Sequence, residues 1–437
     1  MRWMEKYRSH KMSADEAVKV IKSGDRVNVQ PGCATPTALT DAMVRRSGEL
    51  ENVEVMHLLT MGKASYLDAK YEGIFRHLAL FIGSNAREAV SEGRADAMPV
   101  FLSEVPKMFS DGTLPIDVCF IHVSPPDEHG FCSFGVDVSV TKAAADCAKH
   151  VIAQVNRLMP RTLGDSFIHV NKIDTFVTHD APLFEMPQFV PDLNDEKNLV
   201  PLKIGENIVG LINDGDTLQM GIGTIPDAVL YHLREKNDLG VHSEMFSDGV
   251  VDLVEEGIIT NDKKTINRGK MVAGFVLGTR KTFDFIENNP IVEFRPTEYV
   301  NDIKVIAEHD NMVAINSAIE VDITGQVCAD SIGPNLYSGF GGQVDFIRGA
   351  ARSRGGKPII ALPSTAKGDS ISRIVSQLKP GAGVVTTRAD VHWIVTEYGS
   401  VNLHGLSYRD RAREMIRIAH PDFREELESY AKEQKLI

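Results

Sequence analysis

The segment GVHSEMFSDG, residues 240–249, holds a carboxylate, Glu244, among apolar side chains. A strand-like stretch precedes it, and a turn that ends at Gly249 follows it. A carboxylate in such a setting can act as a nucleophile, but it can equally cap a helix, form a buried salt bridge or lie on the surface. Asp248 can cap the helix that follows, which Gly257 would end. Glu244 is thus left without an evident structural role, and the catalytic and structural interpretations both stay open.

The segment GIGTIP, residues 221–226, could hold a ligand near such a carboxylate. It follows a strand-like stretch and opens a helix at Pro226, so its backbone N–H groups can approach an anionic or phosphate-bearing ligand. A dinucleotide-binding fingerprint needs a third glycine where Pro226 stands, which disfavours an NAD site. A plain tight turn explains the same pattern equally well.

A second glycine cluster lies in YSGFGGQVDFIRGA, residues 337–350, and includes Gly339, Gly341 and Gly342. Glycines let the backbone come close to a ligand, and their N–H groups could form an oxyanion hole. The alternative is an ordinary helix start with Asp345 in its first turn. The cations that follow either line a phosphate site or form a solvated face, and they are Arg348, Arg352, Arg354 and Lys357.

The remaining chemistry-bearing residues match no recognised site. His122 and His129 are not at metal-binding spacing, and neither a G-x-S-x-G nor a Walker A pattern occurs. The five cysteines are odd in number and form no CxxC pair, which favours neither a disulfide framework nor a zinc cluster. We therefore expect no metal site.

An internal repeat organises the elements that must position these residues. The segment SGDRVNVQPGCATPTAL, residues 23–39, is similar to DGDTLQMGIGTIPDAV, residues 214–229. Each copy predicts a turn, a short strand, a glycine loop and a helix with proline near its first turn. The order of elements persists further along both halves. A strand–turn–strand pattern lies at residues 117–135 in the first half and at 312–331 in the second. An apolar strand follows it, at residues 151–156 and 358–364.

The two halves differ at the candidate nucleophile. A second strand follows each copy of the repeat, at residues 52–62 and 239–249. Alignment on the glycine that ends each segment sets His57 against Glu244. The sequence therefore predicts two similar halves, with the carboxylate in only one of them.

Strands that alternate with helices predict parallel or mixed sheets covered on both faces. We therefore expect an α/β fold of two tandem, similar α/β/α domains with the active site between them. The boundary is expected within residues 179–200, where prolines interrupt regular structure and a charged stretch suits a linker. This gives an N-terminal domain over 1–190 and a C-terminal domain with Glu244 over 191–437. The chain ends in helices broken at Pro421.

The composition sets the class of protein. A length of 437 residues is too great for one core and supports two domains. Hydrophobic content of 43% and charged content of 24% are typical of a soluble globular protein, and the net charge of −13 argues against nucleic acid as the main partner. No apolar run reaches the ~18 residues of a membrane span, and the N-terminus lacks the apolar core of a secretory signal. We expect a cytoplasmic enzyme.

Four motifs in order along the chain resemble the acetyl-CoA hydrolase/transferase family of class I CoA-transferases, in particular its 4-hydroxybutyrate and butyrate:acetate CoA-transferases. They are SPPDEHGFCSFGVDV, GIGTIPDAV, HSEMFSDG and GFGGQVDFIRGA, and the resemblance covers essentially the whole chain. It implies that Glu244 is the nucleophile. It also implies that the first glycine loop binds CoA through Gly221, Ile222, Gly223, Thr224 and Ile225.

The resemblance implies further site residues. Asn316 in AINSAIE and Gly339 in GFGGQ match family positions near the thioester and pantetheine, and Lys357 in GGKP matches a family lysine. Gly341 and Gly342, with Gly339, would supply the oxyanion hole. The loop QPGCATPTAL in the first half departs from the family pattern, which leaves the acyl-acceptor specificity open.

The implied reaction transfers CoA between an acyl-CoA of the 4-hydroxybutyryl or butyryl class and a short carboxylate such as acetate. Glu244 attacks the thioester to give an acyl-glutamyl anhydride and CoA thiolate. The thiolate then attacks the glutamyl carbonyl, releases the acid and leaves a glutamyl-CoA thioester, which an incoming carboxylate reverses. An apolar setting keeps water from the anhydride. Coenzyme A is therefore a substrate, and no bound cofactor, ATP or metal is expected.

The expected partners are small molecules, an acyl-CoA and a short-chain carboxylate, with no nucleic acid and no membrane. A homo-oligomer, a dimer, is also expected. One alternative is an acetyl-CoA hydrolase of the same family, in which water replaces the second acid. The other is a CoA-binding protein without turnover, against which the intact Glu244 and both glycine loops argue.

Overall fold

The computed structural model describes residues 2–188 and 195–437, and contacts between residues divide the chain into two compact units. The first unit comprises Met1–Pro187 and Val272–Val300, and the second comprises Gln188–Met271 and Asn301–Ile437. The expected boundary between residues 190 and 191 lies outside the described residues. The contacts also differ from a single cut, because the segment Val272–Val300 belongs with the N-terminal unit.

The first unit is built on a sheet with the strand order β4-β3-β2-β1-β5-β7-β9, in which every neighbouring pair is parallel. All six side chains of β5 are buried, as expected for a strand covered on both faces. The strands are β1 (Arg26–Val29), β2 (Val53–His57), β3 (Phe75–Ala79), β4 (Ala95–Ala97), β5 (Val118–Val123), β7 (His150–Val155) and β9 (Thr175–Thr178), with β6 (Phe131–Ser133) and β8 (Phe167–His169) as a separate antiparallel pair.

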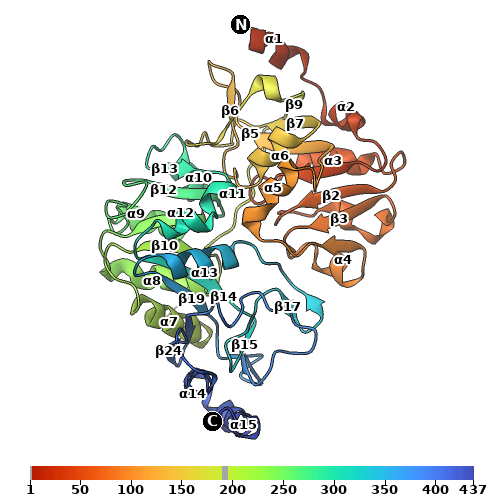
Figure 1. Ribbon diagram of the computed structural model, residues 1–437. Coiled ribbons are helices and arrows are strands. Elements are labelled where there is room, and N and C mark those ends of the chain that lie inside the picture. Colours follow the sequence, from red (N-terminus) through yellow and green to blue (C-terminus); the bar gives the residue numbers. More distant parts are fainter. Residues whose placement is uncertain (1, 189–194) are drawn as a thin grey trace. The chain divides into compact units, whose positions relative to one another are not determined.

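Helices flank this sheet along the chain (Figure 1). They are α1 (Arg2–Ser9), α2 (Ala14–Ala17), α3 (Thr37–Arg45), α4 (Arg87–Ser91), α5 (Val105–Ser110) and α6 (Thr141–Cys147). The later segment contains β12 (Met271–Val276), α10 (Arg280–Ile286), β13 (Val292–Phe294) and α11 (Thr297–Val300), and its two strands lie outside this seven-stranded sheet. Backbone hydrogen bonds tie it to the N-terminal segment, for example from the N–H of Val276 to the carbonyl of Val136 and from the N–H of Phe294 to the carbonyl of Leu163.

Within the second unit the strands follow the order β11-β10-β14-β19-β23-β24. Every pair is parallel except β23 with β24, so the sheet is mixed. These strands are β10 (Thr217–Met220), β11 (Gly240–Phe246), β14 (Met312–Ser317), β19 (Lys357–Ala361), β23 (Trp393–Thr396) and β24 (Gly399–Asn402). Short strands outside it are β15 (Glu320–Asp322), β16 (Val327–Cys328), β17 (Ser331–Ile332), β18 (Asn335–Leu336), β20 (Thr365–Ala366), β21 (Ile371–Ser372) and β22 (Ile374–Val375).

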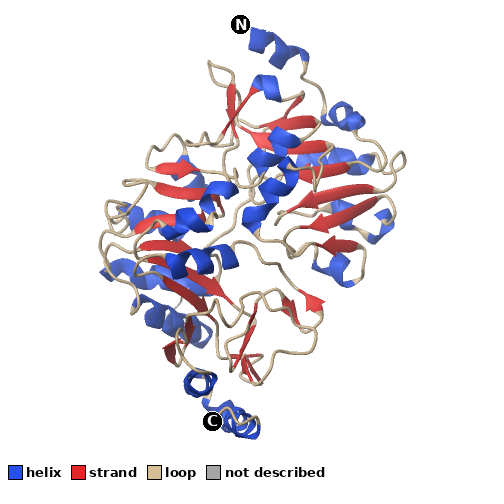
Figure 2. Cartoon of the chain, in the orientation of Figure 1, coloured by secondary structure: helices blue, strands red, loops and turns tan. Residues whose placement is uncertain are grey.

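The helices of the second unit lie on both faces of these strands, as Figures 1 and 2 show. They are α7 (Glu196–Val209), α8 (Thr224–His232), α9 (Asp248–Glu255), α12 (Ile303–Ala307), α13 (Gln343–Arg352), α14 (Tyr408–Ile418) and α15 (Pro421–Glu433). The crossover through α8 runs from β10 to β11, and the crossover through α13 runs the other way, from β14 to β19. Because such connections are right-handed, α8 and α13 cover opposite faces. The break between the last two helices falls at Pro421, as predicted.

In each sheet, the first strand lies in the interior, and the strands that follow it in the chain are added first on one side of it and then on the other. In the first unit β1 lies between β2 and β5, and in the second unit β10 lies between β11 and β14. This shared order confirms the α/β fold predicted from alternating strands and helices. It also creates in each sheet a topological switch point, where ligands of open α/β sheets bind beyond the carboxyl ends of the strands.

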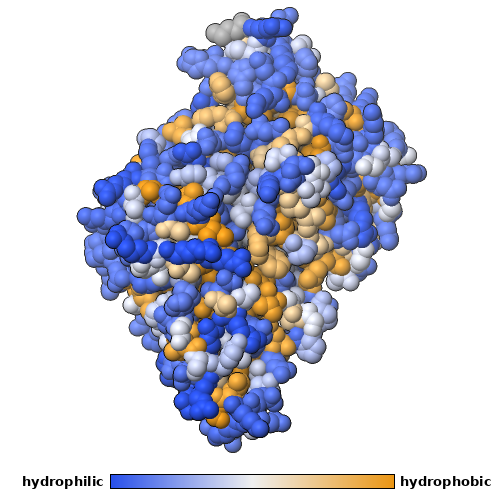
Figure 3. Space-filling view, in the orientation of Figure 1, coloured by the Kyte–Doolittle hydropathy of each residue, from blue (hydrophilic) through white to orange (hydrophobic). Residues whose placement is uncertain are grey.

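The surface is mainly hydrophilic on the face drawn in Figure 3, with apolar side chains gathered in several places. Apolar residues that are more than a third exposed include Ile222 in the first glycine loop and Ile332, Leu336 and Tyr337 around β17 and β18. None of the helices in the described part of the chain has the length and hydropathy that crossing a membrane requires.

Candidate active site

Glu244 lies near the carboxyl end of β11 and is half-buried, whereas every other residue of that strand is buried. The neighbouring strand β10 ends at Met220, directly before the first glycine loop, and β14 ends at Ser317. Parallel strands bring their carboxyl ends to one edge of a sheet. Glu244, the first glycine loop and Asn316 therefore lie along the same edge of the second unit's sheet.

Two groups hold the Glu244 carboxylate. Asn301 Nδ2 donates to Glu244 Oε2 at 3.0 Å, and the backbone of Gly342 hydrogen-bonds to the carboxylate. A Cβ atom at Gly342 would lie 2.0 Å from Glu244 Oε2, so only glycine allows this approach. Gly342 is also the N-cap of α13, which places the carboxylate at the positive end of a helix.

The surroundings of Glu244 shift its protonation. Burial raises the pKa of Glu244 to about 7, because desolvation disfavours the charged form. The hydrogen bond from Asn301 opposes this rise in pKa, the charge of Asp345 adds to it, and the hydrogen bond from Gly342 opposes it. The carboxylate is therefore both present and unusually basic near neutral pH.

Asn301 links Glu244 to a second carboxylate, that of Asp345. Asn301 Nδ2 lies 3.4 Å from Asp345 Oδ2, and both residues are buried. The sequence pattern indicated Asp345 only as a residue of a helix's first turn. It gave no signal for Asn301, which is 57 residues from Glu244 in the chain and follows the short helix α11. The contacts of Asn301 with Glu244 and with Asp345 depend on the folded chain and have no local signature in the sequence.

The first glycine loop presents its backbone to open space. Among the described residues, and apart from each glycine's own chain neighbours, no heavy atom lies within 4 Å of the point where a Cβ would stand at Gly221 or Gly223. Gly223, the N-cap of α8, has φ +106° and ψ −175°, a conformation that is essentially reserved for glycine. Ile222 is exposed, Thr224 begins α8, and Ile225 is buried. The binding of CoA by this loop stays a prediction that this geometry suits.

Asn316 lies at the switch point of the second unit's sheet. It stands near the carboxyl end of β14, and its Nδ2 donates to Oε1 of Gln219 on β10 at 3.0 Å. The pair spans the two strands between which the sheet changes direction. Asn316 is therefore at the edge where the fold favours a ligand.

The second glycine cluster leads directly into the Glu244 contact. Gly341 has φ +52°, in the left-handed region that favours glycine, and it turns the chain into α13 at Gly342. Upstream of Gly339, the N–H groups of Tyr337 and Ser338 both donate to the carbonyl of Asp330, which fixes the loop. Gly342, one of the three predicted oxyanion-hole glycines, contacts Glu244.

The structure does not bring Lys357 to Glu244. Lys357 begins β19, so it lies at the amino edge of the parallel strands, opposite the edge that carries Glu244. Its Nζ pairs with Asp216 Oδ2 at 3.0 Å, and the Asp216 side chain is only 2% exposed. Two of the neighbouring cations are also paired, Arg348 with Asp390 and Arg354 with Asp310. The geometry therefore supports ion pairs at these positions instead of a phosphate site.

Two smaller expectations around Glu244 have different outcomes. The helix α9 begins at Asp248 with Ser247 as its N-cap, so the prediction that Asp248 caps it is wrong, and Asp248 is the first helical residue. Gly257 follows the end of α9 with φ +77°, as predicted for the residue that ends the helix.

The strand register shifts the comparison of the two halves by one residue. Arg26 pairs with Glu54 in the first sheet, and the corresponding Thr217 pairs with Gly240 in the second. Counting from these pairs sets Leu58, and not His57, against Glu244. The alignment on the terminal glycines differs because the segment from Glu244 to Gly249 is one residue longer than the segment from Leu58 to Gly62. His57 instead stacks on His77 with ring centroids 4.0 Å apart.

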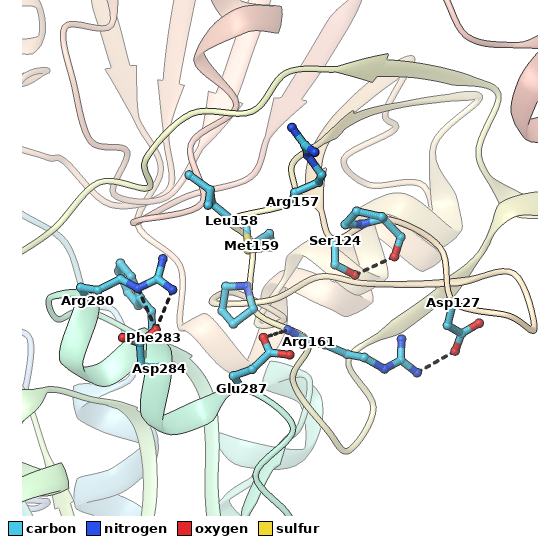
Figure 4. A pocket seen from close by; sticks show the side chains of 12 residues that line it. Ser124, Asp127, Arg157, Leu158, Met159, Arg161, Arg280, Phe283, Asp284 and Glu287 are labelled. Atoms are coloured by element: carbon cyan, nitrogen blue, oxygen red, sulfur yellow. Dashed lines mark hydrogen bonds and ion pairs between the residues drawn. The ribbon is translucent and has the colours of Figure 1, made fainter.

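A separate pocket of about 420 Å³ lies in the first unit (Figure 4). Arg161 pairs there with Asp127 at 2.7 Å and Arg280 with Asp284 at 2.7 Å, so these guanidinium groups already face carboxylates. The backbone N–H of Arg161 donates to Glu287. None of the site residues predicted from the sequence lines this pocket.

Comparison with known proteins identifies the family. Residues 1–186 match the acetyl-CoA hydrolase/transferase N-terminal domain, and residues 278–431 match the C-terminal domain. The chain is 51% identical to the 4-hydroxybutyrate coenzyme A transferase of Clostridium kluyveri over 98% of both chains. It is 49% identical to a succinyl-CoA:acetate/propanoyl-CoA:succinate CoA transferase of Fasciola hepatica, over 96% of this chain and 87% of the relative.

A solved structure agrees with these matches. The crystal structure of a 4-hydroxybutyrate CoA-transferase from Porphyromonas gingivalis aligns with a TM-score of 0.85 and 40% identity, over 99% of this chain and 100% of the other. The two domain matches and the high identity over nearly the whole length confirm the resemblance drawn from the four sequence motifs. The chain belongs to the acetyl-CoA hydrolase/transferase family.

Proposed function

We propose that the protein is a CoA-transferase that moves CoA between an acyl-CoA of the 4-hydroxybutyryl or butyryl class and a short carboxylate such as acetate. The family and the 51% identity to a 4-hydroxybutyrate coenzyme A transferase support this activity. The observation that carries the proposal is the Glu244 carboxylate, held by Asn301 and Gly342 at the start of α13.

The proposed reaction uses Glu244 as a covalent carrier. A carboxylate oxygen of Glu244 attacks the acyl-CoA carbonyl, and CoA leaves as a thiolate. The thiolate attacks the glutamyl carbonyl of the anhydride, which expels the first acid and leaves a glutamyl-CoA thioester. An incoming carboxylate then reverses these steps, so the kinetics are ping-pong. Asn301 Nδ2 and the Gly342 N–H would bind the glutamyl oxygen as it becomes an oxyanion, because they already bind it as a carboxylate.

The edge of the sheet offers a path for the CoA chain. The open backbone of Gly221–Ile225, at the start of α8, suits the approach of an anionic or amide-rich ligand. Asn316 and Gln219 add polar groups between β10 and β14. We assign the pantetheine and thioester of the acyl-CoA to the sheet edge at Asn316 and Gln219. We assign further contacts with CoA to the loop Gly221–Ile225.

Detection of the glutamyl-CoA thioester tests the proposal. The protein is incubated with butyryl-CoA without an acceptor acid and examined by intact-mass analysis, followed by peptide mapping. The expected result is one CoA attached at Glu244, and its absence in Glu244→Ala together with loss of turnover. An active Glu244→Ala variant, or an adduct on another residue, would overturn the assignment.

Kinetic assays with and without acetate distinguish CoA transfer from hydrolysis. With acetate present, acetyl-CoA should form with parallel double-reciprocal lines, whereas without a carboxylate free CoA should appear only slowly after the first turnover. Rapid and sustained release of CoA in acid-free buffer would instead identify an acyl-CoA hydrolase. A panel of carboxylates that includes 4-hydroxybutyrate, butyrate, succinate and acetate would identify the preferred acid.

A further inference from the structure

The carboxylate of Glu244 shares its amide donor with the carboxylate of Asp345. We propose that Asp345 is a positioning residue whose charge, held beside Glu244 by the amide that both carboxylates share, favours the neutral covalent forms of Glu244 over its free carboxylate. This inference rests on the proposed function, because it requires Glu244 to become a thioester.

The geometry of Asn301 joins the two acids. Its Nδ2 is 3.0 Å from Glu244 Oε2 and 3.4 Å from Asp345 Oδ2, so each amide hydrogen can point at one carboxylate. Ionised carboxylates only accept hydrogen bonds, which requires the nitrogen and not the oxygen of the amide to face them. The Asn301 side chain is fully buried, and its Oδ1 has no hydrogen-bond partner among the described residues. The carboxylates are therefore what orients this amide.

The helix α13 brings the second negative charge to the same place. Asp345 is in its first turn, and Gly342 at its N-cap hydrogen-bonds to Glu244. The positive end of one helix thus faces two carboxylates, of which that of Asp345 is buried. Like charges so close together, away from water, disfavour the ionised form of each other. The charge of Asp345 accordingly contributes to the raised pKa of Glu244.

The proposed reaction removes this repulsion when the thioester forms. The balanced half-reaction converts the Glu244 carboxylate and an acyl-CoA into glutamyl-CoA and a free carboxylate. The acyl C–S bond breaks, a glutamyl C–S bond forms, and one oxygen of Glu244 leaves in the released acid. The negative charge therefore departs from the site with that acid. Asp345 raises the energy of the free enzyme but not that of the neutral thioester, which shifts this equilibrium towards the thioester.

Other ionisable groups near α13 must be separated from this effect. Burial lowers the pKa of His309 to about 2, so this residue stays neutral at the pH of an assay. Arg348 of α13 forms an ion pair with Asp390. His242 of β11 lies with its ring 6.2 Å from that of Phe346 in α13. A His242→Gln variant shows whether this imidazole contributes to any pH profile.

The direct test measures the equilibrium of the half-reaction. Wild type and Asp345→Asn are incubated with butyryl-CoA and increasing butyrate, quenched, and resolved by intact mass into free and CoA-bearing enzyme. If Asp345 acts as proposed, the ratio of butyryl-CoA to butyrate at half-conversion should rise about tenfold in the variant. The acid limb of kcat/KM, which reports the free enzyme, should move about one pH unit lower.

A second variant gives an effect of opposite sign. Asn301→Ala removes a donor that stabilises the Glu244 carboxylate, so its acid limb should move to higher pH. General disruption of the site would not move the two limbs in opposite directions. Asp262→Asn, which removes an exposed carboxylate of the same unit, is the matched control and should behave as wild type. Melting temperatures establish that each variant is folded.

The outcomes distinguish this inference from the function on which it rests. A wild-type enzyme that forms no thioester at Glu244 would overturn both. A wild-type thioester with an unchanged half-conversion ratio in Asp345→Asn, or with both acid limbs shifted the same way, would overturn the role of Asp345 alone. If Asp345→Asn does not fold, the test rests on the acid limb of the kcat/KM profile of Asn301→Ala. An acid limb that stays in place or moves to lower pH in this variant contradicts the coupling of Asn301 to Glu244.

Discussion

Gly342 and Glu244 are in contact in a way that leaves no space for a side chain. A Cβ added at Gly342 would stand 2.0 Å from Glu244 Oε2 and 2.3 Å from Asn301 Nδ2. The two atoms belong to a strand and a turn that are distant from Gly342 in the chain. The start of α13 therefore defines where the carboxylate can lie.

The first prediction is that Gly342→Ala displaces the nucleophile. The added methyl group must push the Glu244 carboxylate aside, and a misplacement of about 1 Å can lower a rate on the order of 100-fold. We expect kcat to fall by about that factor in steady-state assays with butyryl-CoA and acetate, with a smaller change in KM.

Gly210→Ala is the matched control for this substitution. Gly210 follows α7, and a Cβ at this position would meet its nearest atoms at ordinary contact distance, 3.4 Å or more. This variant should keep wild-type kinetics. Full activity in Gly342→Ala would mean that the carboxylate does not need its present position.

The second prediction concerns the pH dependence of turnover. The pKa of Glu244 is raised to about 7, and only the ionised form can attack a thioester. The kcat/KM for acyl-CoA should therefore fall about tenfold per pH unit below pH 7 and level off above it. A profile that stays flat down to pH 5 would show that Glu244 remains ionised there and that its burial has little effect.

The third prediction concerns stability. Because the pKa of Glu244 in the folded state, about 7, lies above the ordinary value of 4.5, the folded state binds the proton more tightly. The stability associated with the proton is present below pH 4.5 and is lost as the pH rises through 7. Glu244→Gln should therefore be more stable than wild type at pH 8, by roughly 1–3 kcal/mol, with the difference disappearing towards pH 5.

Melting temperatures at pH 5, 6.5 and 8 measure this difference. Glu244→Gln should also be inactive at every pH, so activity and stability change in opposite directions. Equal melting temperatures of the two proteins at pH 8 would contradict a destabilising buried charge at Glu244.

The fourth prediction concerns the loop Gly221–Ile225. If this loop holds the CoA chain, contacts remote from the sulfur should lower the barrier as well as aid binding. Butyryl-pantetheine should then show a reduced kcat relative to butyryl-CoA, and each tenfold loss corresponds to about 1.4 kcal/mol at the barrier. Gly223→Val should reproduce part of this loss with intact butyryl-CoA, because φ +106° is unsuited to a branched residue.

Gly221→Ala serves as the comparison within the same loop. Gly221 lacks a positive φ and has open space around it, so the substitution adds bulk without backbone strain. It should lower kcat less than Gly223→Val. Equal kcat values of the wild type for butyryl-CoA and butyryl-pantetheine would mean that the part of CoA beyond pantetheine contributes nothing to the chemical step.

The fifth prediction assigns Lys357 a structural role. Lys357→Met would leave the buried Asp216 carboxylate without its cation, which typically costs about 3–5 kcal/mol. We expect a clear drop in melting temperature with little change in the KM for acyl-CoA, and partial recovery of stability in Lys357→Arg. A large rise in the KM for acyl-CoA with an unchanged melting temperature would instead support a role of Lys357 in CoA binding.

The order of elements could be predicted from the sequence because it depends on local patterns. Short apolar strands, glycine turns and prolines at helix starts recur in both halves, and the structure places β1–α3–β2 and β10–α8–β11 in the same relation. The return of residues 272–300 to the first unit could not be read in this way. It depends on which surfaces pack together, and no local pattern records that.

The site was predictable where one segment carries the chemistry. Glu244 and Gly342 lie in distinctive motifs, whereas Asn301 has an ordinary turn sequence and acquires its role only through a contact across 57 residues. The motif around Lys357 carries no information on strand direction, so it does not show at which edge of the sheet this lysine lies. A residue that begins a parallel strand lies at the opposite edge from one that ends a neighbouring strand.

The strand register of the first unit has a consequence for active-site stoichiometry. Leu58 stands where the second unit has Glu244, and a hydrocarbon side chain can neither attack a thioester nor carry an acyl group. Although the chain contains two copies of one sheet plan, it offers a single reactive carboxylate at this position. An active-site titration should therefore count one equivalent of CoA per polypeptide, and an assembly of two chains should saturate at two.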